Sequence, residues 1–198
     1  MEFVKETHTY IKDGIVLKSV TQILKELFPS KYEGIPEGIL KEKSEYGTKV
    51  HKCIEVLEKS KSKNPLAYVK QKYKPNAYQL FSINEYLRIK KEYNIEITDS
   101  ERMVSYKHLY AGTLDLKGYV NGKSAIIDIK TTYEADINYV SWQNSLYELA
   151  SEPVDKLYLL WLPKCGRGQL FEVGRIDKEL ILALIGDNDE EKSMDWFW

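Results

Sequence analysis

The dipeptide Asn121-Gly122 constrains the fold of this chain more than any other feature of its sequence. Asparagine and glycine both tolerate the positive φ that a two-residue type I′ turn requires, so the pair predicts a tight β-hairpin. Alternating apolar and polar residues on both sides indicate the two strands. With a loop of two residues, Val120 must pair with Lys123, and every further pair follows by counting outward.

Counting outward brings charged side chains together. Asp115 is expected directly opposite Asp128, and Thr113 opposite Lys130, and partners in an antiparallel pair point to the same face. One face therefore carries Thr113, Asp115, Lys117, Tyr119, Ser124, Ile126, Asp128 and Lys130. The other face is apolar and is expected to lie against the core: Leu114, Leu116, Val120, Ala125, Ile127 and Ile129.

Two carboxylates that face each other across a hairpin destabilise it unless something offsets their repulsion. A proton shared between Asp115 and Asp128, the ammonium of Lys130, or a bound divalent cation could each do so. Mg²⁺ suits the geometry because it takes one or two carboxylates and keeps waters and substrate oxygens in its other positions. The alternative is a solvated strand face with incidental charges, and the hairpin alone does not decide between them.

The composition is that of an ordinary globular protein, with 198 residues, 43% of them hydrophobic and 30% charged. We expect one domain over residues 1–198, with 58–94 as a lysine-rich helical insertion and 186–198 as an acidic and aromatic tail. No apolar run is long enough to span a membrane and no signal peptide is evident, so a cytoplasmic protein without membrane contact is expected. The net charge of −1 argues against a uniformly basic surface, so phosphate contacts would come from local patches.

Helices and strands alternate along the chain. A capping box of Ser19 and Gln22 predicts one helix start, and apolar periodicity, proline and glycine predict the other boundaries. The expected helices are 20–28, 37–60, 75–93, 135–150 and a last one from Asp177 to Ile185. The expected strands are 8–11, 15–17, 95–106, the hairpin within 111–132, 155–162 and 169–176.

Within the helix expected at 37–60, Gly47, His51 and Glu55 are spaced four apart and lie along one face. A glycine inside a helix costs about 1 kcal/mol against alanine, so Gly47 suggests that another part of the molecule approaches the backbone there. The lysine-rich segment that follows is either a solvated surface or a phosphate-contacting patch. Its lysines are Lys59, Lys61, Lys63, Lys70, Lys72 and Lys74.

Five separated motifs follow one another along the chain. They are His8-Thr9-Tyr10 with Ser19-Val20-Thr21-Gln22, then Gly47-Thr48-Lys49-Val50-His51, Gly112-Thr113-Leu114-Asp115, Asp128-Ile129-Lys130-Thr131, and Gln143 to Tyr147. Each is weak alone, but the set in this order resembles the PD-(D/E)XK nuclease superfamily, and within it the RecB-like and phage-type exonucleases. The resemblance covers about residues 7–176. It implies a mixed α/β (α+β) fold with a restriction-endonuclease-like core, whose central mixed sheet has α-β-β-β-α-β order and flanking helices.

The resemblance also implies a metal site. Asp115 and Asp128 would be Mg²⁺ ligands, with Mn²⁺ able to substitute, and the carbonyl of Ile129 would complete the site. His51 would be a metal ligand or a phosphate contact, and Glu101 a further catalytic carboxylate. Relatives with an iron–sulfur cluster need four cysteines, and this chain has two, so no such cluster is expected.

Further residues would act on the substrate. Lys130 would orient or deprotonate the attacking water and stabilise charge on the phosphate. Gln143 and Tyr147 would contact the DNA backbone or support Lys130. Additional substrate contacts are expected from Thr131, Lys70, Lys72 and Lys74.

Together these expectations describe a metal-dependent DNA exonuclease of phage-type recombination, repair or end processing, acting in the host cytoplasm. Its partners would be DNA and a single-strand-annealing or single-strand-binding protein, and an oligomer is compatible with the resemblance. A non-cleaving nucleic-acid-binding module and a DNA endonuclease are the alternatives. The tail, with its Trp196-Phe197-Trp198 end, would pack on the domain or bind a partner.

Overall fold

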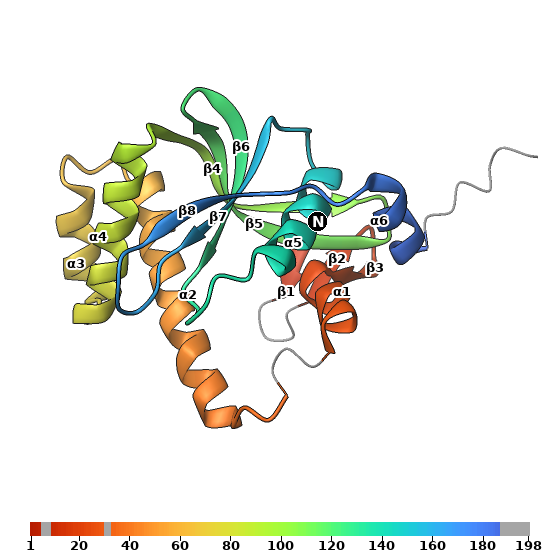
Figure 1. Cartoon of the computed structure of the whole chain (residues 1–198), viewed down its shortest axis with the longest axis horizontal. Helices are drawn as coiled ribbons and strands as arrows, with labels where there is room; N and C mark the ends of the chain where they lie inside the picture. The colour runs from red at the N-terminus through yellow and green to blue at the C-terminus, as the bar shows by residue number, and fades with distance from the viewer. Residues whose placement is uncertain (5–8, 30–32, 187–198) are drawn as a thin grey trace, which may run out of the picture.

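The computed structural model describes residues 1–4, 9–29 and 33–186. His8 of the first motif and residues 187–198 of the expected tail lie outside the described residues. Within them the chain forms a mixed α/β fold with one eight-stranded sheet and six helices (Figure 1). The strands are β1 (Glu2–Val4), β2 (Thr9–Lys12), β3 (Ile15–Ser19), β4 (Ile95–Tyr106), β5 (Tyr110–Val120), β6 (Lys123–Lys130), β7 (Lys156–Trp161) and β8 (Gln169–Val173). The helices are α1 (Val20–Leu27), α2 (Glu37–Lys59), α3 (Pro65–Tyr73), α4 (Ala77–Glu92), α5 (Ile137–Leu149) and α6 (Lys178–Ile185).

The hairpin of β5 and β6 has the predicted turn and register. Asn121 and Gly122 have φ of 49° and 77°, the positive values that a type I′ turn requires. The antiparallel ladder runs from Val120–Lys123 to Leu116–Ile127 and ends one position before Asp115 and Asp128. The prediction of the turn is confirmed, and the two aspartates lie where the strands part.

The sheet forks at this point. β4 pairs with β5 over its whole length, from Tyr110 to Val120, and occupies one of the two edges of β5. On the other edge β3 pairs with Tyr110 and Ala111, whereas β6 pairs only from Leu116 onward. Among the described strands, residues 112–115 of β5 therefore have no partner on that edge.

Helices cover both faces of the sheet, which has the order β1-β2-β3-β5-β6-β7-β8 with β4 paired to β5 (Figure 1). One face packs against α1 and α5, and the buried cluster between them includes Val20, Ile126 and Leu146. The other face packs against α2 and α4, and the buried cluster there includes Ile54 and Ile83. Because helices cover both faces, the strands bury apolar side chains on both faces of the sheet.

This arrangement changes two expectations about the hairpin. Ile126 and Asp128, expected on a charged face, are each only 1% exposed, so that face is not a solvated surface. Leu114 packs with the α1–α5 cluster, although strict alternation grouped it with Leu116 of the other cluster. The alternation of β5 is therefore broken between Leu114 and Leu116, next to the point where the ladder to β6 ends.

The helix caps explain where the predicted boundaries hold and where they move. Ser19 and Gln22 form the expected capping box at the start of α1, with hydrogen bonds of 3.1 and 2.7 Å. Asn76 and Gln79 form a second one, so α4 begins at Ala77 rather than at the expected Pro75. The lysine-rich segment contains α3, capped by Asn64. No described helix is both long and apolar enough to cross a membrane.

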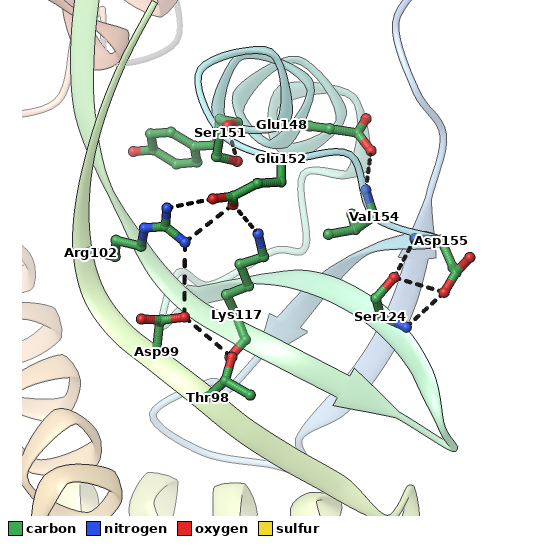
Figure 2. Close-up of polar contacts among 11 residues, drawn as sticks. Thr98, Asp99, Arg102, Lys117, Ser124, Glu148, Ser151, Glu152, Val154 and Asp155 are labelled. Atoms are coloured by element: carbon green, nitrogen blue, oxygen red, sulfur yellow. Dashed lines mark hydrogen bonds and ion pairs between the residues drawn. The ribbon is translucent and has the colours of Figure 1, made fainter.

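A surface network joins β4 and β5 to the turn after α5 (Figure 2). The carboxylate of Glu152 accepts hydrogen bonds from Arg102 at 2.8 and 3.2 Å, and it also pairs with Lys117. Asp99 lies 3.9 Å from Arg102 at the edge of the network. The Glu152 side chain is 58% exposed, so these ion pairs form in water.

Candidate functional site

The carboxylate of Asp115 spans the fork between β5 and β6. Its Oδ2 accepts a hydrogen bond of 2.7 Å from the backbone N–H of Ile129, which the shortened ladder leaves without its usual strand partner. Its Oδ1 lies 3.2 Å from Nδ1 of His51 on α2. Burial opposes the charge of Asp115, but His51, Lys130 and the N–H of Ile129 together outweigh it, and the pKa of this carboxyl group is lowered.

Three side chains converge at this carboxylate from three elements. His51 of α2, Glu101 of β4 and Asp115 of β5 each offer one ligand atom, and these atoms lie within 4.8 Å of one another. Burial by itself lowers the pKa of His51, yet the Asp115 carboxylate reverses the effect, and the net pKa is raised. Burial, and then Asp115, raise the pKa of Glu101 to about 7. An imidazole and two carboxylates are a donor set for a divalent cation.

Glu101 reaches the group through an irregular backbone. It has φ of +51° in the middle of β4, in the left-handed region that residues other than glycine seldom adopt. The flanking pairs Ser100–Leu116 and Arg102–Leu114 place it opposite Asp115. Strained residues of this kind cost about 1–3 kcal/mol and gather at functional sites, so the observed φ marks Glu101 for function.

Asp128 lies beside this group but is not a member of it. Its Oδ2 lies 2.6 Å from Nζ of Lys130, and its side chain is 1% exposed. Neither buried oxygen accepts a hydrogen bond of normal geometry from the described residues. Burial raises the pKa of Asp128 to about 6, opposed by Lys130 and reinforced by Asp115. This carboxylate is therefore buried with capacity to accept a proton or bind a cation.

Lys130 connects the carboxylates to α5. Its Nζ donates a hydrogen bond of 2.9 Å to Oε1 of Gln143, whose Nε2 donates in turn to the hydroxyl of Tyr147 at 3.2 Å. Burial lowers the pKa of Lys130, but Asp128 and Asp115 outweigh it, and the net pKa is raised. Gln143 and Tyr147 stand four positions apart on α5, so one face of the helix presents both. The ammonium is therefore held charged and fixed in direction.

Two glycines allow this close packing. A Cβ added at Gly47 would lie 3.0 Å from Oγ1 of Thr131, which confirms the expected approach to the α2 backbone and assigns Thr131 a packing contact there. A Cβ added at Gly112 would lie 2.7 Å from Cε1 of Tyr147 and 3.0 Å from Cγ2 of Val20. Both glycines therefore set how closely the site elements approach.

The expected site residues thus fall into distinct groups. The structure gathers His51, Asp115 and Glu101, pairs Asp128 with Lys130, and uses the N–H of Ile129 to hold Asp115. Three expected substrate contacts, on α3 and its cap, do not join these groups. They are the exposed lysines Lys70, Lys72 and Lys74.

Sequence reasoning missed Tyr10 as a site residue. Its hydroxyl lies 2.9 Å from Oγ1 of Thr113 and its side chain is 7% exposed. Burial and the charge of Glu101 raise its pKa, so the phenol stands near the metal group. The available signal was the opening motif, in which Tyr10 is the third residue.

Comparisons with known proteins give little. No family model matches the chain, and no curated protein matches it. Among solved structures, one described as "Crystal structure of SSO0001" is 18% identical with a TM-score of 0.42, covering 90% of this chain and 77% of that chain. A likeness at this level carries no argument about activity, so any inference of function must come from the geometry of the site.

Proposed function

We propose that this chain is a metal-dependent nuclease of the PD-(D/E)XK type that hydrolyses phosphodiester bonds in DNA from an end. The observation that carries the proposal is the convergence of residues distant in sequence. His51 of α2, Asp115 of β5, and Asp128 with Lys130 of β6 meet at the fork of the sheet. Four of the five motifs behind the family resemblance contribute these residues and the Gln143–Tyr147 support of Lys130.

The residues present fit a divalent cation. The buried oxygens of Asp128 lack hydrogen bonds from the described residues, and His51, Glu101 and Asp115 supply three further donor atoms within 4.8 Å of one another. Asp115 and Asp128 would hold Mg²⁺ or Mn²⁺, with His51 and Glu101 as further ligands. When bound, such a cation lowers the pKa of a ligated water and stabilises negative charge on a phosphate.

The chain's own groups account for the rest of the chemistry. The Nζ of Lys130 carries a positive charge, directed by Gln143, that can orient a water and stabilise charge on the scissile phosphate. The carboxyl group of Glu101, with its pKa near 7, can take up or release a proton at neutral pH. Tyr147 fixes Gln143, and through it Lys130.

The deciding experiment is degradation of linear DNA with Mg²⁺, and again with Mn²⁺. Asp128→Ala should reduce the rate by at least about 10³-fold while leaving DNA binding intact, since it removes a buried charge at the proposed centre. Asp155→Ala is the matched control, because Asp155 is an exposed aspartate that bonds Ser124 far along β6. EDTA should stop degradation by the wild-type protein.

Other outcomes would select another function. If the wild-type protein binds DNA but never degrades it with either metal, the chain is a binding module on this fold. Nicking of closed circular DNA would make it an endonuclease, whereas a strict need for an end supports the proposal. Roles in phage recombination, repair or end processing, with an annealing or single-strand-binding protein as partner, follow from the same proposal.

A further inference from the structure

A groove lies next to the metal group, between α2 and α3. At about 100° per residue, His51, Thr48, Lys52 and Lys49 follow one another around the accessible side of α2. The groove therefore begins one side chain away from a residue of the metal group. It has a volume of about 370 Å³ and is lined by Ser44, Glu45, Thr48, Lys49, Lys52 and Tyr73.

The groove is predominantly basic. Lys49 donates a hydrogen bond of 3.4 Å to the carbonyl of Lys74, which draws the cap of α3 to the rim. Glu55 lies 2.5 Å from Lys52 and 3.0 Å from Lys59, so one carboxylate serves two ammonium groups. Of the charged residues that line the groove, Lys49 and Lys52 are cationic and Glu45 is anionic.

An aromatic ring lies within this positive surface. Tyr73 lines the groove and is half-buried, with Lys72 5.5 Å from its ring centre. Lys52 lines the same groove and directly follows His51 of the metal group in the sequence. Lysines beside an aromatic ring are the elements that proteins use to bind single-stranded nucleic acid.

We propose that this groove holds an unpaired strand of the DNA substrate next to the scissile phosphate, with a base stacked on Tyr73 and phosphates on Lys49 and Lys52. The inference rests on the proposed function and narrows its substrate to ends with an unpaired strand. A volume of about 370 Å³ matches a single small ligand rather than a double helix. Inside a duplex both faces of a base are covered by its stacked neighbours, so a base must leave the stack before its face can meet the Tyr73 ring.

Binding in EDTA tests the groove without cleavage. Fluorescence anisotropy would compare a labelled oligothymidylate with a blunt hairpin duplex of equal phosphate number. Tyr73→Leu should weaken binding of the single strand about tenfold, the loss of one stacked base, and leave the duplex unchanged. Tyr73→Phe keeps the ring and should bind as the wild type does. Tyr119→Leu is the matched control, because Tyr119 is an exposed tyrosine on β5 beside the hairpin turn.

The lysines give a second measurement. Lys49→Gln with Lys52→Gln should reduce the salt slope of single-strand binding by about 1.4, at roughly 0.7 per phosphate lost. The control pair Lys123→Gln with Lys178→Gln removes the same charge far from the groove, at the starts of β6 and α6, and should leave the slope unchanged. Circular dichroism melts would establish that all variants fold.

Each alternative outcome has a definite meaning. The inference is wrong if Tyr73→Leu binds the single strand as tightly as Tyr119→Leu does, or if Tyr73→Phe loses as much affinity as Tyr73→Leu. It is also wrong if duplex and single strand weaken equally. If the wild-type protein never cleaves DNA but Tyr73→Leu weakens single-strand binding, the nuclease proposal is wrong and the proposed strand-binding groove stands. If the protein cleaves DNA but Tyr73→Leu has no effect on binding, the nuclease proposal stands and the groove proposal is wrong.

Discussion

Two regions near α5 set carboxylates against cations. The Asp128–Lys130 pair is buried, whereas the network of Glu152 with Arg102 and Lys117 lies in water (Figure 2 shows the network). Two cations lower the pKa of the exposed Glu152 to about 2. A cation at 2.6 Å does not do the same for Asp128, whose pKa is raised to about 6 because burial outweighs it. Burial, rather than the presence of a partner, decides which carboxylate is available for chemistry.

The largest expected difference between the two regions is in cleavage. Lys130→Gln should lower the rate of DNA degradation by about 10²–10⁴-fold, because it removes a charge held at the proposed reaction centre. Lys117→Gln removes a lysine of the neighbouring strand that pairs with Glu152, and should leave the rate unchanged. Single-turnover assays at saturating enzyme would measure both. Equal rates for the two variants would remove the distinction between the regions.

The next largest effect concerns the packing of the buried region. Gly112→Ala should destabilise the protein by about 1–3 kcal/mol, since its Cβ would meet Tyr147 at 2.7 Å and Val20 at 3.0 Å. That corresponds to roughly 2–12 °C in Tm for a chain of this size. Gly174→Ala meets nothing within 4 Å and should melt like the wild type. Calorimetry would measure Tm for both variants. An unchanged Tm for Gly112→Ala would show that the Tyr147 ring can move to accommodate the added methyl group.

The pH dependence of stability should also separate the regions. Asp128 and Glu101, with pKa values of about 6 and about 7 when folded against 3.8 and 4.5, bind protons that the unfolded chain has released. The raised pKa of His51 acts in the same direction. In EDTA, the free energy of unfolding should therefore fall as pH rises from about 5 to 8.

Melts between pH 5 and 8 would measure this trend, and Asp128→Asn with Glu101→Gln should flatten it. Glu152→Gln should not, because the pKa of Glu152 near 2 lies below the window. Stabilisation by Mg²⁺ should be greater at pH 8 than at pH 6, since a cation competes with these protons. A larger effect at pH 6 would contradict carboxylate ligation.

The smallest effect is expected in the exposed network. Glu152→Gln should cost at most about 1 kcal/mol at low ionic strength, because ion pairs in water are weak. At 0.5 M NaCl the difference should shrink further through screening. Urea titrations at two salt concentrations would measure it. A cost of 3 kcal/mol that salt leaves unchanged would mean that the network behaves like the buried pair.

The sequence predicts what local chemistry determines. The Asn121-Gly122 turn, the Ser19 capping box and the close approach at Gly47 all depend on neighbouring residues or on the absence of a Cβ, and all three are found. The second capping box, of Asn76 and Gln79, has the same kind of local signal and starts α4 two positions after Pro75, where the proline alone predicts the start.

Features that depend on tertiary packing could not be predicted in the same way. The left-handed backbone of Glu101 has no signal in the sequence, because glutamate has no preference for positive φ. The position of Asp128 beside Lys130, outside the group of His51, depends on the fork of the sheet. A hairpin register cannot show that a third strand takes over one edge at Ala111.

The hairpin determines how Asp115 and Asp128 are placed relative to each other. Asp115 and Asp128 each stand six positions from the turn, so the strand lengths on its two sides determine which way both carboxylates face. One residue inserted into either strand would reverse the side to which its aspartate points and leave the other aspartate in place, so the two carboxylates would separate. The site thus requires a fixed number of residues between the two aspartates, whereas the two turn residues need only tolerate positive φ.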